Sequence, residues 1–226
     1  MLAKFNGNFP ATRAFSKFAR ELVNDVDPRG NPDHALVTWM EIEERLFVTL
    51  ERHLVGDRLR AGFDTQGTPD VDGFLKFSLS VQNRRKSRAG FAFANHIEEL
   101  IKLRGIRYKR EATTEKRAGP DFLFPGECEY HDSNWPEDGL IMLAAKTTCK
   151  DRWRQALAEA NRIKNKHLIT LEPGISPTQT TEMRRERLQL IVPAPLHQSY
   201  RDEQKRELLS VLAFLELVQR TQRRAG

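Results

Sequence analysis

Apolar residues in the first part of the chain recur at helical spacing. Residues 27–32 form a turn-rich segment, and the run from about 35 to 59 that follows it has one apolar face. A second helix is predicted over about 91–104, whereas residues 74–79 fit either a short strand or a helical turn. The pattern therefore predicts a helical N-terminal region over 1–90. The apolar face of its first long helix comprises Leu36, Trp39, Met40, Ile42, Leu46, Leu50 and Leu54.

The periodicity changes after about residue 105, where short apolar runs bounded by turns replace the helical pattern. Helices are predicted between and after these runs, over about 151–164, 178–187 and 202–220. The last of them is apolar over a wide arc, which fits a core helix or a dimer contact. The apolar runs themselves predict five strands, at 106–110, 121–124, 140–146, 167–171 and 188–192.

This order of elements predicts an α/β fold. Three strands joined by short turns form an antiparallel meander, and a helical crossover then adds the last strands. The result is a mixed five-stranded sheet with helices on both faces, built from residues 91–193. We expect residues 1–226 to form a single domain, because a chain of 226 residues is long enough to bury one core.

Charge adds a preference for a partner. The chain has 37 Lys and Arg residues against 31 Asp and Glu, a net charge of +6, and its sequence pI is about 9.5. A basic balance favours a polyanion such as nucleic acid, although many proteins without such a partner are equally basic.

Composition also predicts where in the cell the protein acts and the chemical state of its two cysteines. No run of apolar residues approaches the roughly 20 that a membrane span needs, and residues 1–6 do not open a signal peptide, so we expect a cytoplasmic protein. Cys128 and Cys149 lie 21 positions apart without clustered histidines. This spacing predicts reduced thiols rather than a disulfide framework or a zinc site.

Residues 83–90 concentrate positive charge directly before the predicted helix at 91–104. One interpretation is a solvated charged turn, which needs no ligand. The other is contact with DNA phosphates by Arg84, Arg85 and Arg88, because positive side chains beside a helix N-terminus add to the field that attracts anions.

An acid and a lysine stand at the ends of neighbouring predicted strands. Asp121 begins one strand after Gly119 and Pro120, and Lys146 ends the next strand 25 residues later. In an antiparallel meander these two ends lie side by side. A carboxylate there binds a divalent metal, and a lysine stabilises or deprotonates a water that attacks phosphorus. The pair alone is a weak signal, since many turns begin with Pro-Asp.

Nucleases with this arrangement usually carry a second acid two residues before the lysine, on the same side of the strand. Here that position is Ala144, so either the site is inactive or another element supplies the acid. Glu159, on the helix predicted after the strand, is one candidate. The alternative for Glu159 is a surface ion pair with Arg162, one turn later.

The segment from Lys146 to Gln155, KTTCKDRWRQ, resembles the corresponding signature of EcoRII-type restriction endonucleases, relatives of enzymes that cut at CCNGG, CCWGG and CCGG sites. The resemblance extends over about residues 9–214. It implies a restriction-endonuclease-like fold and Mg²⁺-dependent cleavage of double-stranded DNA. Three further segments are similar to the family's catalytic domain: FLKFSLSVQNRRKSRAG at 74–90, PDFLF at 120–124 and KHLITLEPGISPT at 166–178.

The resemblance also removes the objection at Ala144. In this family a small residue replaces the acid before the lysine, and a glutamate on the following helix takes its place. Asp121 and Glu159 would then be the metal ligands, and Lys146 would orient the attacking water and stabilise developing charge. Glu98 would be the acid contributed by the preceding helix, with Glu99 as the alternative.

Base recognition is expected in Lys150, Asp151 and Arg152, directly after the catalytic lysine. Lysine or arginine can donate to guanine O6 and N7, and a carboxylate can accept from cytosine N4. The alternative is ordinary polarity at a helix N-terminus, where an acid such as Asp151 is favoured by the dipole.

Enzymes of this family flip the central base pair of their site through an arginine and an aromatic residue on the N-terminal side. The predicted helix with Arg45, Phe47 and Arg52 is the region in which we expect these residues.

The resemblance implies a homodimer on double-stranded DNA at a CCWGG- or CCNGG-like site, with a DNA methyltransferase of the same system as its functional partner. The family's type member carries an additional N-terminal effector domain; if this sequence is complete, we expect a simple dimer acting on one site. Two alternatives remain open: a monomeric repair or nicking nuclease of the same fold, and a catalytically inactive DNA-binding module.

Overall fold

The computed structural model describes residues 1, 4–5, 8–65, 67–115 and 119–225. The chain divides into two compact units, which are described separately. The helical unit comprises Met1–Asn24 and Thr38–Asn95, and the sheet unit comprises Asp25–Val37 and His96–Gly226. No helix in the described ranges is long and apolar enough to cross a membrane.

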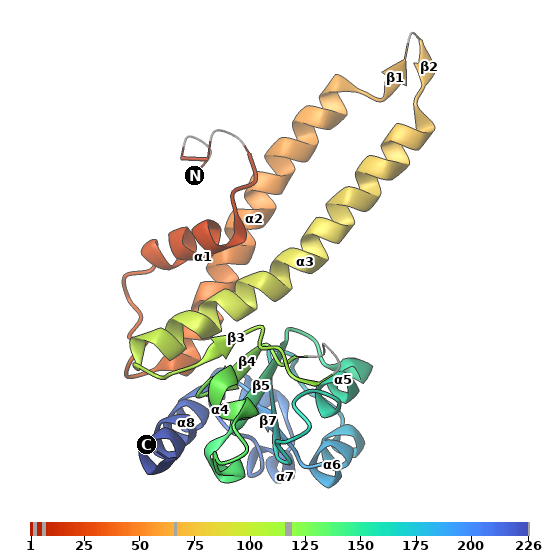
Figure 1. Ribbon diagram of the computed structural model, residues 1–226. Helices are drawn as coiled ribbons and strands as arrows, with labels where there is room; N and C mark the ends of the chain where they lie inside the picture. Colours follow the sequence, from red (N-terminus) through yellow and green to blue (C-terminus); the bar gives the residue numbers. More distant parts are fainter. Residues whose placement is uncertain (2–3, 6–7, 66, 116–118, 226) are drawn as a thin grey trace. The chain divides into compact units, whose positions relative to one another are not determined.

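Three helices and a short hairpin build the helical unit (Figure 1). Helix α1 spans Thr12–Glu21, and the unit takes most of α2, Pro32–Ala61, and of α3, Val71–Leu103. The small strands β1, Asp64–Thr65, and β2, Thr68–Pro69, join α2 to α3. Phe15, Phe47 and Leu50 form its apolar cluster, so the predicted helical region is confirmed.

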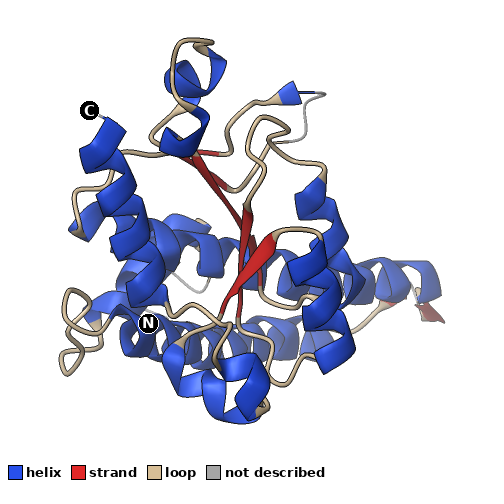
Figure 2. Ribbon diagram, turned by 90° about the horizontal axis from the view of Figure 1, so that it is seen from below, coloured by secondary structure: helices blue, strands red, loops and turns tan. Residues whose placement is uncertain are grey.

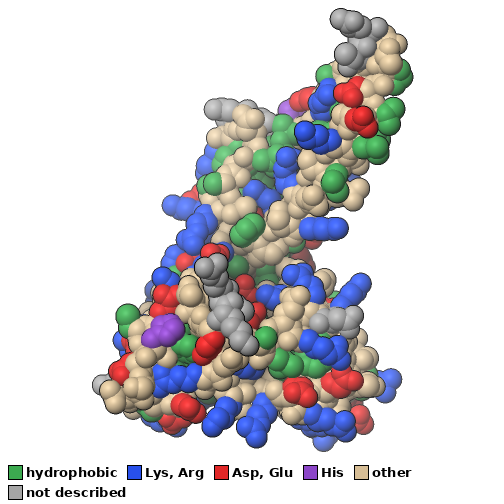
Figure 3. All heavy atoms as spheres, turned by 45° about the vertical axis from the view of Figure 1, so that its right-hand side comes forward, with side chains coloured by type: hydrophobic (Ala, Val, Ile, Leu, Met, Phe, Trp, Pro, Cys, Tyr) green, Lys and Arg blue, Asp and Glu red, His purple; other side chains and the backbone are tan. Residues whose placement is uncertain are grey.

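The start of α3 resolves the ambiguous segment at 74–79, which is helical. Its apolar residues do not mark a single face: Phe74 packs on Phe63, whereas Leu75 and Leu79 are more than half exposed. Hydrophobic side chains accordingly appear among charged ones on the surface (Figure 3). A segment with apolar residues on two sides gives neither the period of a helix nor that of a strand clearly.

The predicted helix start at residue 91 is wrong, because α3 runs without a break from Val71 to Leu103. The basic stretch 83–90 is therefore the interior of a helix, and its arginines do not flank a helix N-terminus. The sequence between Val71 and Leu103 contains no proline, and the glycine at position 90 costs a helix only about 1 kcal/mol relative to alanine.

The sheet unit contains five strands in the order β3-β4-β5-β6-β7. The first three pair antiparallel, and β6 and β7 join them in parallel. Figure 2 shows the strands with helices on both sides. This confirms the predicted meander, crossover and mixed sheet. The strands are β3, Lys109–Arg110; β4, Phe122–Phe124; β5, Ile141–Lys146; β6, Lys166–Thr170; and β7, Leu188–Ile191.

Each face of the sheet packs on a different set of residues. Met142, Ala144 and Leu168 belong to a core cluster with Trp153 and Ala156 of the following helix. The opposite face includes Phe124 and His167, whose rings contact Phe214 of the C-terminal helix. The helices of this unit are α4, Glu127–His131; α5, Trp153–Leu157; α6, Pro177–Arg185; α7, Asp202–Lys205; and α8, Val211–Ala225.

Two predicted helices are shorter than expected. The helix at 151–164 is a 3-10 turn, η3, Lys150–Arg152, followed by α5, which ends at Leu157. The helix at 202–220 is divided into α7 and α8. Its interruption has a tertiary cause: Leu209 exchanges backbone hydrogen bonds with Leu190 and Val192 at the end of β7. Two further 3-10 helices are η2, Glu137–Gly139, and η4, Ala194–Ser199.

Candidate active site

The start of β4 and the end of β5 bring Asp121 and Lys146 together. These strands are antiparallel, with Phe122 opposite Leu143, so the acid at the start of β4 and the lysine at the end of β5 lie at the same end of the strand pair. The Lys146 ammonium donates to Asp121 Oδ2 over 3.0 Å, and the backbone N–H of Ala145 donates to the same oxygen over 2.7 Å. The predicted side-by-side placement of the two strand ends is confirmed.

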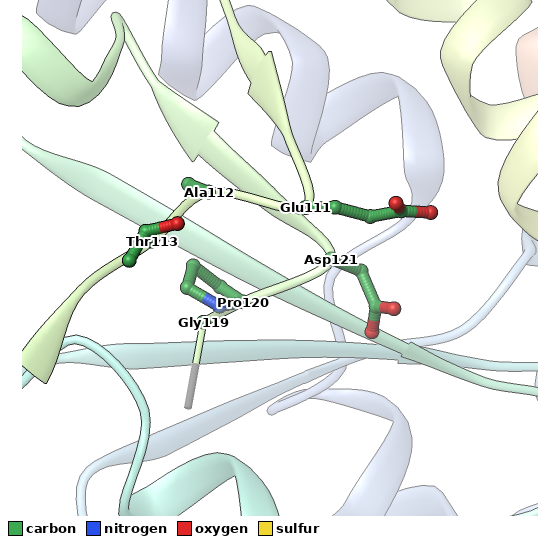
Figure 4. Close-up of a pocket in the computed structure, with 6 residues that line it drawn as sticks. All are labelled: Glu111, Ala112, Thr113, Gly119, Pro120 and Asp121. Carbon is green, nitrogen blue, oxygen red and sulfur yellow. The ribbon is translucent and has the colours of Figure 1, made fainter. Parts of the chain in front are cut away.

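A hollow opens beside Asp121 (Figure 4). Gly119 sets its shape, because a Cβ at this position would lie only 1.6 Å from the carbonyl oxygen of Ala112. The chain can therefore approach Ala112 closely only with glycine there, and this approach leads directly into Pro120 and Asp121. In Figure 4 the carboxylates of Glu111 and Asp121 extend toward the same side of the hollow.

Glu159 lies in the bend after α5, two residues beyond the end of the helix, so its expected place on a helix is wrong. Its carboxylate oxygen Oε2 is buried without a hydrogen-bond partner among the described residues. Burial raises the pKa of Glu159 to about 7; Lys146 opposes this shift and the charge of Asp121 adds to it. Glu159, Lys146 and Asp121 thus share one electrostatic site.

The alternative surface pair between Glu159 and Arg162 is not formed. Arg162 donates instead to backbone carbonyls of the segment around α4, including those of Tyr130, Asp132 and Trp135. Its guanidinium therefore ties the bend to that segment, and leaves the Glu159 carboxylate to other partners.

The two carboxylates fit a hard divalent cation. Asp121 and Glu159 supply oxygen ligands, and the unpartnered Glu159 oxygen is a buried group that lacks the partner such atoms normally have. Within the described ranges no group of three or more acidic, histidine or cysteine side chains is placed to hold a metal. A donor set of two carboxylates suits Mg²⁺, which usually retains several waters.

Glu98 of α3 is buried, and Glu99 is only partly so. Glu98 accepts hydrogen bonds from Tyr108 over 2.8 Å and from Arg110 over 2.7 Å. Burial acts to raise the pKa of Glu98, but these two bonds and the charges of Arg110 and Lys102 together outweigh it and hold the pKa below its usual value. Arg110 stands opposite Phe122, the residue after Asp121. Glu98 is thus an acid linked through Arg110 to the strand that follows Asp121, and its catalytic role stays a prediction.

The segment expected to read bases follows Lys146 in the sequence, and side chains from later parts of the chain hold its backbone by hydrogen bonds. The Glu172 carboxylate accepts the N–H groups of Cys149 and Lys150, and the Gln179 amide donates to the Lys150 carbonyl over 2.6 Å. The Lys150 and Arg152 side chains are exposed. The side chain of Asp151 lies outside the described part of the structure. Sequence reasoning did not single out Glu172, whose role depends on a contact 22 residues away.

The three arginines expected to contact phosphates differ in exposure. Arg88 is 6% exposed, donates to the Pro10 carbonyl over 2.9 Å and packs on the Phe15 ring. Arg84 packs on the Phe9 ring, while Arg85 is exposed and pairs with Glu51. Arg88 therefore serves the packing of the helical unit. Phosphate contact by all three remains a prediction, and Arg85 is the most accessible of them.

The residues in the region expected to flip bases lie on α2 of the helical unit. Arg45 and Arg52 line a shallow hollow on this helix. Phe47 is 7% exposed and packs on Phe9 with ring centroids 5.6 Å apart. A buried Phe47 does not offer a ring to an extruded base, so the two arginines are the more accessible candidates.

Comparison with known proteins finds relatives in sequence and in fold. The family model described as "EcoRII C terminal" matches residues 47–215. The type II restriction enzyme EcoRII of Escherichia coli is 43% identical over 186 residues, which are 82% of this chain and 45% of that protein. The chain thus spans less than half the length of this curated relative.

Two solved structures share the fold. The structure of metal-depleted Ecl18kI in complex with uncleaved, modified DNA superposes with a TM-score of 0.79 at 20% identity, covering 98% of this chain and 82% of the other. The complex of restriction endonuclease PspGI with substrate DNA gives a TM-score of 0.75 at 16% identity, covering 96% and 94%. At these identities the similarity shows the fold alone.

Proposed function

This chain belongs to the family of the EcoRII C-terminal domain, and we propose that it is a type II, site-specific double-strand DNA endonuclease that requires Mg²⁺. The observation that carries the proposal is the contact between Asp121 and Lys146, with the buried Glu159 carboxylate in the same electrostatic site. An acid, a lysine and a second acid in one electrostatic site are groups that metal-assisted phosphodiester hydrolysis uses.

Asp121 and Glu159 would hold Mg²⁺, which when bound supplies Lewis-acid activation of the scissile phosphate. Lys146 would orient the attacking water and stabilise the negative charge that develops on the phosphate oxygens. Asp121 keeps the Lys146 ammonium in place by accepting from it. In-line attack by this water would break the bond to the 3′ oxygen, leaving a 5′-phosphate and a 3′-hydroxyl.

Base reading would fall to Lys150, Asp151 and Arg152. Because Lys146 and Arg152 are only six positions apart, a wrong base would displace the catalytic lysine as well as remove a contact. The site would be CCWGG- or CCNGG-like, read by the donors of Lys150 and Arg152 and the acceptors of Asp151.

The assembly would be a homodimer whose twofold axis coincides with that of the pseudo-palindromic site, each subunit cutting one strand. A DNA methyltransferase of the same system would protect host DNA in the cytoplasm without binding this protein. Arg84, Arg85 and Arg88 would contribute to phosphate binding, with Arg85 the most accessible, and Glu98 would act as the additional acid of the site.

The test uses plasmids that carry single CCNGG-type sites, incubated with Mg²⁺ and either the wild-type protein or Lys146→Ala. We expect the wild type to linearise the plasmid at the site, and the variant to bind DNA without cutting it. Sequencing the ends identifies the central base pair. Nicked but never linear product would indicate the monomeric nicking nuclease, and site binding without any cleavage would indicate the inactive DNA-binding module.

A further inference from the structure

The bend that carries Glu159 is held by a buried lysine from the neighbouring strand. Lys166 is the first residue of β6 and is 6% exposed. Its ammonium donates to the backbone carbonyl of Glu159 and, over 2.6 Å, to that of Ala160. We propose that Lys166 is a positioning residue, which fixes the Glu159 carboxylate for metal binding by anchoring its backbone. The inference rests on the proposed function, because it concerns the same metal site.

The anchor itself is rigid. The Lys166 backbone N–H donates to the Arg187 carbonyl over 2.9 Å, and Lys166 stands opposite Leu188 in the parallel pair of β6 and β7. The backbone of Lys166 is therefore held by its pairing with β7 at the start of β6, through contacts separate from the bend.

The bend has an unusual backbone that needs such support. Ala160 has a φ of 48°, a left-handed conformation that costs a residue with a Cβ roughly 1 kcal/mol or more. The short helix α5 ends at Leu157, so Glu159 is not held by helical hydrogen bonds on both sides. Its orientation depends on contacts from other elements.

Further contacts hold the bend through its N–H groups. The Thr114 hydroxyl oxygen accepts the Ala160 N–H at 3.4 Å, and the Glu115 carboxylate accepts the Asn161 N–H at 3.1 Å. Glu115 also accepts the Tyr130 hydroxyl proton at 2.6 Å. The carbonyls of the bend are thus bound from β6 and its N–H groups from the segment between β3 and β4.

Holding the bend with the Lys166 ammonium has a free-energy cost, because burying a charged group loses several kcal/mol of hydration free energy. A neutral donor would satisfy the same carbonyls at lower cost. The charged Lys166 is favoured at this bend because the negative carboxylates of Glu115 and Glu159 lie near its ammonium and offset part of that cost. Groups that orient metal ligands typically change metal affinity by about 10- to 100-fold when they are removed.

The experiment compares Lys166→Met, which keeps the length but removes the charge and the donors, with Lys166→Arg, which keeps both. Lys164→Met is the matched control, because Lys164 is a surface lysine of the same segment that forms an ion pair with Glu137. Three quantities are measured: Mn²⁺ binding by electron paramagnetic resonance, the Mg²⁺ concentration for half-maximal cleavage, and metal-free binding to a duplex with the site.

We expect Lys166→Met to weaken Mn²⁺ binding, and to raise the half-maximal Mg²⁺ concentration, by about 10-fold or more. Cleavage at saturating Mg²⁺ and metal-free DNA binding should stay close to wild type. Lys166→Arg should restore most of the metal affinity, and Lys164→Met should change neither quantity. Wild-type Mn²⁺ affinity in a folded Lys166→Met protein would overturn the proposal, as would equal losses in Lys166→Met and Lys164→Met.

If Lys166→Met does not fold, Thr114→Val provides the second variant. It removes the acceptor for the Ala160 N–H and leaves the lysine in place. Weaker Mn²⁺ binding by folded Thr114→Val supports an oriented bend, and unchanged binding overturns it. The proposed function fails separately: a wild type that binds Mn²⁺ but cuts no site refutes the endonuclease, whereas a wild type that cuts alongside a variant with normal Mn²⁺ affinity refutes only the role of Lys166.

Discussion

Lys146 and Asp121 meet through a single carboxylate oxygen: Oδ2 accepts both the lysine ammonium and the backbone N–H of Ala145. The lysine ammonium, a compact charge on a flexible side chain, makes this contact through Oδ2 and does not bind Oδ1. An arginine would behave differently, because its planar fork tends to bind both oxygens of a carboxylate at once.

The first prediction follows from this geometry. Lys146→Arg keeps the charge but should occupy both oxygens of Asp121, and so compete with the metal for that ligand. We expect single-turnover cleavage at the site to fall about 100-fold or more, comparable with the loss of one stabilising donor in other enzymes. Cleavage within a few-fold of the wild-type rate would show that the lysine acts only through its charge.

A second prediction concerns Glu159, whose buried carboxylate destabilises the metal-free protein at high pH. Its pKa in the folded protein, about 7, is above the ordinary value of 4.5, so the folded state holds the proton more tightly than the unfolded state. Protonation of Glu159 therefore gives the folded protein its full free energy of unfolding below pH 4.5. That free energy decreases as the pH rises to 7 and the buried side chain ionises. Glu159→Gln removes this loss.

We expect metal-free Glu159→Gln to melt at a higher temperature than the wild type at pH 8, and the difference to shrink toward pH 5. Added Mg²⁺ should raise the melting temperature of the wild type but not of the variant, since only the wild type retains both ligands. Cleavage should be lost. A variant that is less stable than the wild type at pH 8 without metal would contradict this account of the buried carboxylate.

The pair of Asp121 and Lys146 was accessible from the sequence, whereas the support of Glu159 was not. Short apolar runs, with Gly119 and Pro120 before the first of them, indicate where β4 begins and β5 ends, and those are local signals. The path of the chain at Glu159 depends on Lys166, Thr114 and Glu115, two of which lie more than 40 residues away in sequence. These contacts end α5 early, although the residues after Leu157 are compatible with a helix.

The predicted helix start at residue 91 was wrong for a local reason, not because of long-range contacts. The basic stretch 83–90 was placed before a helix, as a solvated charged turn or a phosphate-contact segment, but helix propensity continues through it. The different surroundings of its arginines come from partners far along the chain, such as Pro10 for Arg88. Composition predicts that such a segment is polar; it does not predict which of its arginines is buried.

A third prediction distinguishes a specific contact with a DNA base from general attraction of DNA by positive charge. Arg152 and Arg154 are both exposed arginines next to Trp153, but Arg154 pairs with Glu182 over 2.9 Å and packs on the Trp153 ring. We expect Arg152→Ala to weaken binding to the cognate duplex by ~1–3 kcal/mol and to relax the preference at one base position. Arg154→Ala should change binding to all sequences only slightly. Equal effects of the two substitutions would argue against a base contact by Arg152.

The last prediction concerns His167, which is buried on the face of the sheet that packs against α8. Burial lowers its pKa from the ordinary 6.5 to about 4, and its ring contacts Phe214. In the unfolded chain His167 is therefore protonated below pH 6.5, whereas in the folded protein it stays neutral until about pH 4. Stability should fall through this window, by roughly 3 kcal/mol in total at 1.36 kcal/mol per pKa unit.

Urea unfolding at intervals from pH 4 to 7.5 measures this effect by comparing wild type with His167→Leu. The leucine fills similar space and cannot titrate, so the difference in unfolding free energy between the two proteins should change steadily in favour of His167→Leu as the pH falls. Because Glu159 is present in both proteins, its opposite pH dependence cancels in this difference. His34→Gln, at an exposed position in the same unit, is the control and should follow the wild-type curve. Parallel curves for wild type and His167→Leu would show that His167 is protonated in the folded protein, and that the fold accommodates the charge.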